Sequence, residues 1–356
     1  MPQDPGTPTR GHPDTSSALD PYQRVLQKTF DHRIPFTAHW ELTYRCNLSC
    51  LHCYATNRTG GKELTTNEVR NGLDQLARMG CLFLALTGGE VFCRSDLLEI
   101  LTYAKQRSFA LYLFTNGTML TPDAADAIAA IEPVSVDISL YAVTPEIHDR
   151  ITTVRGSHEK TVKALRLCRN KGLNVTIKSP LLRYNIDEFE RLRSFANDIG
   201  ARFVFDFLLV PADDGSRPMQ EHGLSEQELR RFIAANVQHP EVAPEAPHES
   251  AYLCGAGSNA ICITPTGDVL PCLAIREPVG NLRQQRLAEI WKSPLLDKLR
   301  NSRYRSLVDC RGCEDASYCS RCAGVAHAEC GNILGRQDSA CVVARATKEA
   351  VEARRP

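Results

Sequence analysis

Three cysteines stand close together in the stretch CNLSCLHCY, which runs from Cys46 to Tyr54. Cys46, Cys50 and Cys53 are separated by three and by two residues, so one loop can present three thiolates to a metal. A structural zinc site is closed by a fourth protein ligand, and His52 lies too near Cys53 in sequence for both to bind one ion. An iron–sulfur cluster on three cysteines instead leaves one iron open for a ligand that is not protein.

A second group of cysteines fills the C-terminal part of the chain. Nine of the 15 cysteines belong to it: Cys254, Cys262, Cys272, Cys310, Cys313, Cys319, Cys322, Cys330 and Cys341. A zinc ribbon would use four of them, and its pairs stand further apart than Cys313 and Cys319 do. Since disulfides are rare in a reducing cytosol, so many thiols favour metal binding. The isolated Cys81, Cys93 and Cys168 are interpreted as small buried side chains.

The charge balance excludes several classes of partner. The chain has 356 residues, with 42 basic and 42 acidic side chains, so it lacks the positive charge that binds nucleic acid or anionic lipid. No apolar run is long enough to cross a membrane, and the first residues lack a signal-peptide pattern. The length allows two domains. We therefore expect a cytoplasmic protein that binds neither nucleic acid nor a membrane.

Strand and helix patterns alternate between the two groups of cysteines. Six strands are predicted, at residues 36–43, 81–87, 110–114, 134–140, 174–180 and 202–210. Such alternation indicates an α/β fold in which a parallel sheet is covered by helices. A closed eight-stranded barrel usually needs about 250 residues, so six strands predict a partial (βα)6 parallel barrel.

Polar motifs follow four successive strands of this predicted barrel. The cysteine loop comes after the first strand, TGGE at 87–90 after the second, TNG at 115–117 after the third, and SLY at 139–141 closes the fourth. In parallel α/β folds the chemistry lies at the C-terminal ends of the strands. We therefore expect these four motifs to share one rim of the barrel.

The CxxxCxxC loop followed by an aromatic residue, after a first strand and ahead of GGE, resembles the radical S-adenosylmethionine (SAM) superfamily over about 34–210. The resemblance implies a [4Fe–4S] cluster on Cys46, Cys50 and Cys53, whose open iron is chelated by the amino and carboxylate groups of SAM. It also implies an enzyme in which one electron splits SAM into methionine and a 5′-deoxyadenosyl radical, which then removes hydrogen from an unactivated C–H bond.

The same resemblance implies SAM contacts by Tyr54, Gly88, Gly89, Glu90, Asn116, Ser139 and Arg155. The glycines would let the backbone approach the methionine moiety, and Glu90 would accept from its ammonium group. The tyrosine would lie beside the adenine, and Asn116 and Ser139 near the ribose and carboxylate. Arg155 would pair with the carboxylate. Val91 departs from the family pattern, which usually has proline after GGE.

The stretch CGAGSNAICITPTGDVLPC, with CRGCEDASYCSRC after it, resembles the SPASM domain, which binds auxiliary [4Fe–4S] clusters in radical SAM maturases. The resemblance assigns auxiliary cluster I to Cys254, Cys262, Cys272 and Cys322. It assigns auxiliary cluster II to Cys310, Cys313, Cys319 and Cys341. The spacing between Cys319 and Cys322 is one residue shorter than in the family. Cys330 is left over and could replace Cys262 or Cys341.

These assignments divide the chain into four parts. Residues 1–33 are rich in proline, threonine and aspartate and are predicted to be a flexible tail. The barrel spans 34–210, a connector with one helix, capped at Ser225, spans 211–252, and the SPASM domain spans 253–349. ITPTGDVLP predicts a hairpin inside the last part.

The leading interpretation is a peptide or protein maturase that makes a crosslink, an oxidation or an epimerisation. It would need an external one-electron donor of the flavodoxin or ferredoxin type. The tail is too short for a peptide-recognition domain, so a separate recognition protein is expected. The alternatives are a sulfatase-maturating formylglycine-forming oxidase, disfavoured because Leu273 rather than aspartate follows Cys272, a tetrapyrrole-modifying enzyme, and a non-enzymatic zinc-ribbon protein.

Overall fold

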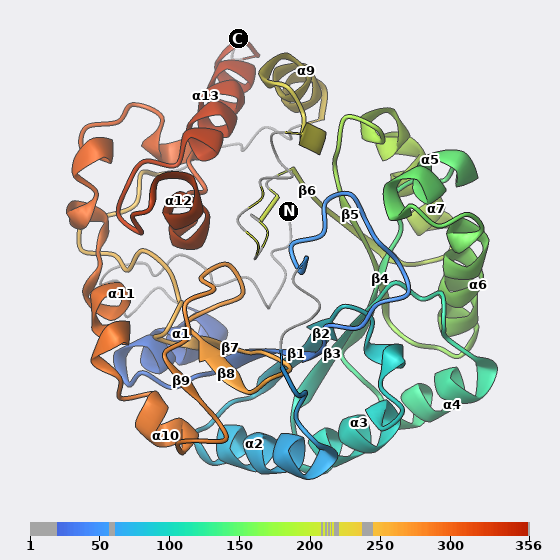
Figure 1. Cartoon of the computed structure of the whole chain (residues 1–356). Coiled ribbons are helices and arrows are strands. Elements are labelled where there is room, and N and C mark those ends of the chain that lie inside the picture. Colours follow the sequence, from blue (N-terminus) through green and yellow to red (C-terminus); the bar gives the residue numbers. More distant parts are fainter. Residues whose placement is uncertain are drawn as a thin grey trace.

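A nine-stranded sheet organises the molecule (Figure 1). The computed structural model describes residues 20–56, 61–207, 209–210, 212, 214, 216, 221–236 and 245–354. The strand order is β6-β5-β4-β3-β2-β1-β7-β8-β9. Neighbouring strands from β6 to β7 are parallel, and β8 and β9 are antiparallel additions at the edge. The sheet curves into an open arc, as the partial barrel predicts.

The six predicted barrel strands are all present and parallel. They are β1 (Thr37–Thr43), β2 (Phe83–Gly88), β3 (Ala110–Thr115), β4 (Ser135–Ser139), β5 (Val175–Pro180) and β6 (Arg202–Asp206). The helices after them are α2 (Thr66–Arg78), α3 (Leu97–Gln106), α4 (Pro122–Ile131), α5 (Pro145–Thr152), α6 (Ser157–Asn170) and α7 (Phe189–Asp198). Thr65 and Glu68 form a capping box that fixes the start of α2. The α/β fold class is therefore confirmed.

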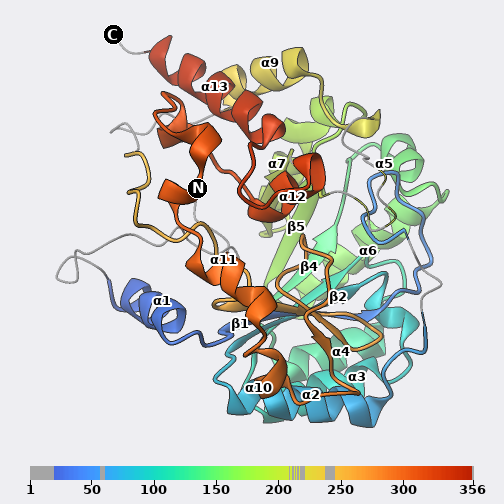
Figure 2. The same ribbon diagram turned by 60° about the vertical axis from the view of Figure 1, so that its left-hand side comes forward.

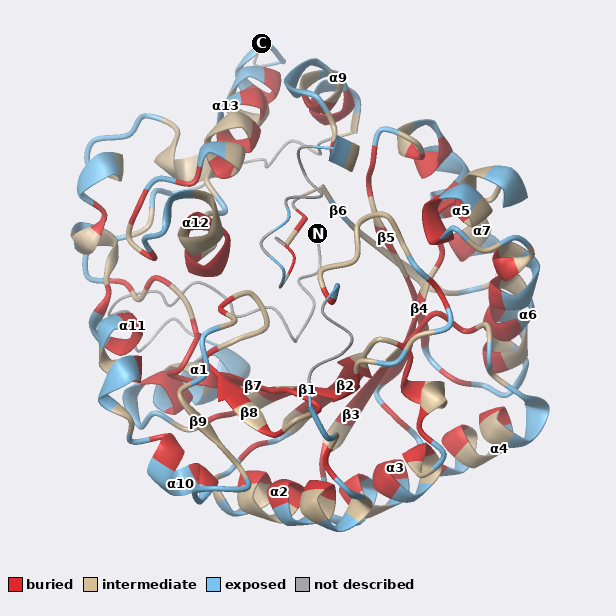
Figure 3. Cartoon of the chain, viewed as in Figure 1, coloured by how far each residue is buried: buried red, intermediate tan, exposed pale blue. Residues whose placement is uncertain are grey.

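Side chains of β1 alternate between the two faces of the sheet, as a strand requires. Ala38, Trp40 and Leu42 belong to the main core, where Trp40 lies against Gly72 of α2. Figure 3 shows the strands around β1 coloured largely as buried. His39 and Glu41 take the opposite, concave face. Glu41 is completely buried, which places a carboxylate in the interior of the barrel.

The C-terminal cysteine region is joined to the barrel sheet itself. Its hairpin, β7 (Ala260–Ile263) and β8 (Asp268–Leu270), forms as predicted, and β9 (Gly280–Asn281) adds a third strand. However, β7 also pairs in parallel with β1, with Cys262 opposite His39. The predicted SPASM part therefore continues the barrel sheet, a pairing that the sequence did not predict.

The remaining C-terminal segments complete the ring around the sheet (Figures 1 and 2). They contain α10 (Leu287–Ile290), α11 (Asp297–Asn301), α12 (Ala323–Cys330) and α13 (Asp338–Glu352). Single 3-10 turns lie at Val91–Cys93, Ile186–Glu188, Pro294–Leu296, Tyr304–Ser306, Val308–Cys310 and Ala316–Tyr318. The predicted connector helix is α9 (Glu226–Asn236), and α13 packs against it through Phe232 and Val343.

The N-terminal prediction is partly wrong. Residues 21–31 form helix α1 (Pro21–Asp31), started by a capping box at Asp20. The helix docks on the C-terminal region, because the ring of Phe30 stacks on Tyr252 at 5.3 Å and Asn259 Nδ2 donates to Thr29 Oγ1 at 3.2 Å. Residues 1–19 of the predicted tail, and much of the predicted connector, lie outside the described residues. Among the described helices, none is both long and apolar enough to cross a bilayer.

We expect Gly72→Ala to destabilise the protein, although alanine favours helix by about 1 kcal/mol. Gly72 lies in α2 directly over the ring of Trp40, and an added Cβ would overlap that ring. Overpacking of this kind costs about 1–3 kcal/mol. Urea unfolding measures the change, and Asn71→Ala, at the exposed neighbouring position, is the control. An unchanged midpoint for Gly72→Ala would show that the indole moves aside without cost.

Candidate functional site

The GGE motif fastens the end of β2 to the chain that leads into the cysteine loop. Gly89 N donates to Thr43 O at 2.8 Å, and Glu90 N donates to Arg45 O at 2.9 Å. Gly88 has a φ of +136°, and a side chain at Gly88 or Gly89 would overlap the carbonyl oxygens of this segment. The two glycines are therefore required by contact between two segments of backbone, whatever ligand lies near them.

The carboxylate of Glu90 ties the end of β2 to the end of β3. It is fully buried, and its Oε1 accepts from Thr115 Oγ1 at 2.7 Å and from Phe92 N at 3.1 Å, while Oε2 accepts from Asn116 N at 2.7 Å. Burial raises the pKa of Glu90, and these hydrogen bonds oppose that rise. Because a carboxylate has about four acceptor positions, most of its capacity is used within the protein.

The cysteine loop is held from two sides at the rim. Asn116, at the end of β3, places Nδ2 3.9 Å from Cys46 Sγ and donates to Asn47 Oδ1 at 3.0 Å. Tyr141, just beyond β4, places its hydroxyl 3.9 Å from Cys50 Sγ. The motifs after β1, β3 and β4 thus meet as the sequence predicted.

The backbone of the same loop is anchored to the end of α5. Ser49 N donates to Thr152 O at 3.2 Å, and Leu51 N donates to Ile151 O at 3.0 Å. These two hydrogen bonds fix the turn at Ser49–Leu51 to α5. The segment that carries Cys46, Cys50 and Cys53 is therefore anchored at its centre.

A buried polar cluster connects the cysteine loop to the C-terminal region. Tyr54 donates to Glu41 Oε1 at 2.9 Å, and Arg276 donates to Glu41 Oε2 at 3.0 Å. Arg276 follows Cys272 by four residues. Burial, and then the neighbouring Glu41 carboxylate, raises the pKa of Tyr54 well above its usual value. Arg276 thereby offsets the negative charge of Glu41 inside the barrel.

Ser139 and Arg155, two other residues predicted to contact SAM, lie in different parts of the structure. Ser139 ends β4 and its hydroxyl interacts with Tyr141. Arg155 is exposed and lines a groove on the outer side of α6, where it forms no ion pair with any described residue. Asp137 is buried and forms an ion pair with Lys178, at 2.9 Å.

Three cysteines assigned to auxiliary cluster I interact with one another. Burial, followed by the nearby Cys254 and Cys322, raises the pKa of Cys272 to about 12. Burial raises the pKa of Cys254 to about 11, with Cys322 again a contributor. Cys262 is completely buried on β7 and interacts with Cys272. Because metal binding requires thiolates, these residues must release protons when a cluster is assembled.

All four cysteines assigned to auxiliary cluster II line one cavity of about 360 Å³. The cavity walls contain Cys310, Cys313, Cys319 and Cys341, together with Arg305, Arg311, Arg321, Arg336 and Arg345. Arg336 interacts directly with the thiol of Cys341. The cysteine set and the surrounding positive charge fit an anionic iron–sulfur cluster.

Cys330 does not belong to that cavity. It is exposed at the end of α12, where its Sγ contacts Ala326 O at 3.1 Å.

Within the described part of the chain, no three His, Cys, Asp or Glu side chains have the spacing needed to hold a single metal ion. Cys81 and Cys168 are buried, as predicted, whereas Cys93 is only half-buried.

Two family models match this chain, and each match contains cysteines of one of the two groups. The Radical SAM superfamily model matches residues 40–196, and the model of the SPASM iron-sulfur cluster-binding domain matches residues 254–314. The first match begins in β1 and ends in α7. The second contains the hairpin and the first two cysteines of the cavity.

Three curated relatives cover most of this chain. It is 26% identical to the AdoMet-dependent heme synthase of Methanosarcina barkeri, over 83% of this chain and 93% of the relative. It is 29% identical to the mycofactocin maturase MftC of Mycolicibacterium smegmatis, over 92% of this chain and 88% of the relative. It is 31% identical to the PqqA peptide cyclase of Ruegeria pomeroyi, over 70% of this chain and 72% of the relative.

A solved structure shares the fold. Streptococcus suis SuiB bound to the precursor peptide SuiA superposes with a TM-score of 0.71 at 17% identity, over 91% of this chain and 82% of that one. The chain belongs to the radical SAM superfamily and carries a SPASM domain. It is therefore an enzyme whose cofactors are [4Fe–4S] clusters and SAM.

Sequence reasoning missed Glu41, Arg276 and Tyr141 as parts of this site. Glu41 gave one signal, since it is the one carboxylate in the strand TAHWELT. Tyr141 belongs to a motif that was noticed for Ser139. Arg276 gave no signal, because only the pairing of β7 with β1 brings it to Glu41.

We expect Glu90→Gln to destabilise the protein by about 1–3 kcal/mol, the cost of a buried donor without an acceptor. Donors face both carboxylate oxygens, so the new amide nitrogen must oppose at least one of them. Urea unfolding checks this, with the exposed Glu99→Gln as control. Unchanged stability with a weaker calorimetric affinity for SAM would instead support direct contact with the SAM ammonium.

Proposed function

We propose that this enzyme modifies a peptide or protein substrate at an unactivated carbon, by crosslinking, oxidation or epimerisation. The observation that carries the proposal is the parallel pairing of β1 with β7, which places Cys262 of the SPASM region beside the strand that leads into the cysteine loop. The names of two relatives, a mycofactocin maturase and a peptide cyclase, support a peptide substrate, as does the peptide bound to SuiB.

We also propose the ligands of three clusters. Cys46, Cys50 and Cys53 would hold the SAM-binding cluster. Cys254, Cys262, Cys272 and Cys322 would hold auxiliary cluster I, and Cys310, Cys313, Cys319 and Cys341 auxiliary cluster II. The shared cavity supports the second auxiliary set, and the mutual interactions of Cys254, Cys272 and Cys322 support the first. The exposed Cys330 stays outside both sets.

The chain's own residues hold and orient the reactants in this proposal. When bound, a [4Fe–4S] cluster on Cys46, Cys50 and Cys53 would supply the one-electron cleavage of SAM to methionine and a 5′-deoxyadenosyl radical. Tyr54, fixed by Glu41, would lie beside the adenine, and Asn116 and Ser139 would face the ribose and carboxylate. Glu90 keeps the ends of β2 and β3 together, and the backbone of Gly88 and Gly89 would face the methionine moiety.

Partners and location are part of the proposal. A flavodoxin- or ferredoxin-type donor would supply the electron, and a separate protein would present the substrate peptide. All 15 cysteines are free thiols, which fits the reducing cytoplasm.

A tetrapyrrole substrate is the second candidate, favoured by the heme synthase relative, which is covered over 93% of its length. Sulfatase maturation has less support, because Leu273 stands directly after Cys272. The two leading candidates differ in substrate size and chemistry, so one assay separates them.

The test is an anaerobic reaction with candidate precursor peptides and, in parallel, with haem precursors. We expect a peptide mass shift that accompanies 5′-deoxyadenosine formation. In Cys313→Ala, which removes a ligand of the proposed auxiliary cluster II, we expect 5′-deoxyadenosine with dithionite but little modified peptide. Normal modified peptide from a soluble variant shown to lack that cluster would reject its role as an electron relay. Turnover of the haem precursor alone would favour the second candidate.

Iron analysis tests the number of clusters. We expect about twelve iron atoms per chain after anaerobic reconstitution, from three four-iron clusters. Cys50→Ala should lose about four of them and all reductive SAM cleavage, while the absorbance of the auxiliary clusters remains, because their ligands lie in another segment. A chain that takes up mainly zinc, or no more than four iron atoms, would contradict the proposed ligand sets.

A further inference from the structure

Tyr141 carries a hydroxyl group that the packing of its ring does not need. The residue lies just beyond β4 and packs with Ile151, Leu182 and Leu209 in a small buried core. A phenylalanine would make the same ring contacts, because these three side chains are wholly apolar. Burying a hydroxyl group costs free energy unless the group has a polar partner. The hydroxyl of Tyr141 therefore requires a polar partner within the protein.

The hydroxyl group lies beside a cysteine of the loop and beside a serine. Its oxygen is 3.9 Å from Cys50 Sγ, which is within hydrogen-bonding distance for sulfur, and it also interacts with the Ser139 hydroxyl. While Cys50 is a thiol, either Cys50 or Tyr141 can be the donor. A cysteine that binds iron is a thiolate, which has no proton and can only accept. A hydrogen bond between these two side chains in the cluster-bound protein must therefore be donated by Tyr141.

Both the ring and the backbone of Tyr141 are held in place. His148 stacks on the ring with the centroids 5.3 Å apart, and His52 meets the ring edge to face at 4.8 Å. The backbone N of Tyr141 donates to His148 Nδ1 at 3.2 Å, and its backbone O accepts from Asn185 Nδ2 at 2.8 Å. A side chain fixed in this way by its neighbours presents its polar group in one direction. The hydroxyl is thus held beside Cys50.

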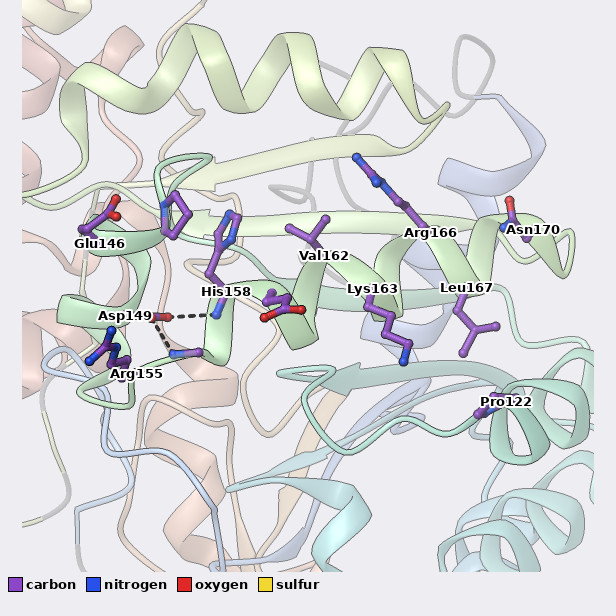
Figure 4. Close-up of a pocket in the computed structure, with 13 residues that line it drawn as sticks. Pro122, Glu146, Asp149, Arg155, His158, Val162, Lys163, Arg166, Leu167 and Asn170 are labelled. Carbon is purple, nitrogen blue, oxygen red and sulfur yellow. Dashed lines mark hydrogen bonds between the residues drawn. The ribbon is translucent and has the colours of Figure 1, made fainter.

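The junction of α5 and α6 fixes His148 in turn. His148 is buried, and its ring centroid lies 5.6 Å from that of His158. The neighbouring Asp149 accepts hydrogen bonds from Gly156 N at 2.6 Å and from His158 N at 2.9 Å, at the start of α6 (Figure 4). These bonds hold α5 against the first turn of α6. The support of Tyr141 therefore extends from the cysteine loop to the outer helices.

We propose that Tyr141 donates a hydrogen bond to the Cys50 thiolate and thereby raises the reduction potential of the cluster on Cys46, Cys50 and Cys53. Reduction adds one negative charge to the cluster and its thiolates, and a hydrogen bond to a ligand sulfur stabilises the reduced state more than the oxidised state. The cluster gains one electron from its reductant, and the phenolic proton stays on Tyr141. Tyr141 acts through Cys50 and not on SAM. The proposal rests on the cluster ligands given under the proposed function.

The test compares Tyr141→Phe with Tyr184→Phe in the reconstituted full-length enzyme. Tyr141→Phe removes the hydroxyl and keeps the ring contacts with His52 and His148, so the variant should fold. Tyr184 packs against the same small core, but its hydroxyl lies 3.2 Å from His222 Nδ1, which makes Tyr184→Phe the matched control. Urea unfolding and iron content establish that each variant folds and takes up the same amount of iron as the unmodified enzyme.

The reduction potential is measured by a redox titration followed by electron paramagnetic resonance, and the affinity for SAM is measured by calorimetry. The signal that is lost in Cys50→Ala identifies the cluster of the cysteine loop among the auxiliary clusters. No peptide or other substrate is added, so failure of the proposed substrate class leaves this test intact. A Cys50→Ala variant that keeps every signal would refute the proposed ligand set, and this proposal with it.

We expect Tyr141→Phe to shift the redox equilibrium towards the oxidised cluster by about three- to ten-fold, which for one electron is a potential about 30–60 mV more negative. Its affinity for SAM should not change, and Tyr184→Phe should match the unmodified enzyme in both measurements. An unchanged potential in Tyr141→Phe would overturn the proposal and leave Ser139 as the partner of the hydroxyl. An equal shift in Tyr184→Phe would also overturn it, because packing and not the hydrogen bond would then set the potential.

Discussion

Strand β1 is paired in parallel on both sides, with β2 and with β7, and the arrangement of the rest depends on this double pairing. The first partner brings the GGE motif against the chain that enters the cysteine loop. The second brings Cys262, from a region more than 200 residues further along the chain, opposite His39. Because directly paired residues of neighbouring strands point to the same face of a sheet, Cys262 shares the concave face of the barrel with His39. A separate C-terminal domain would not have this constraint.

Two fully buried carboxylates stabilise this arrangement, and each is satisfied by protein. Glu41 is neutralised by Arg276 and accepts from Tyr54, while Glu90 accepts three hydrogen bonds around the ends of β2 and β3. A buried charge without such partners is costly, so removing any one partner should disturb the rim. The hydrogen bonds of Glu41 connect the barrel to the SPASM region, and those of Glu90 connect two neighbouring barrel strands. Both hold the backbone at the barrel rim beside the cysteine loop.

The chemistry is distributed over three environments that differ in charge and exposure. The cysteine loop lies at the barrel rim, braced by Asn116 and Tyr141. Of the cysteines proposed for auxiliary cluster I, Cys262 is buried in the sheet and the other three are half-buried, whereas those proposed for auxiliary cluster II line a cavity rich in arginine. Positive charge near a cluster favours its reduced form, so these arginines fit a centre that accepts electrons.

The sequence by itself determined the family and the six parallel strands, because these depend on short-range spacing and on local periodicity. It also predicted the capping box of α2 and the hairpin of β7 and β8. It failed at the N-terminus, where helix α1 is stabilised by Tyr252 and Asn259, residues that local composition cannot reveal. Only the tertiary structure showed that Glu90 fastens two strands, that Arg155 faces the outside, and that Arg276 reaches Glu41. These facts arise from strand pairing between distant segments, and the register of such pairing is decided by packing of the whole sheet.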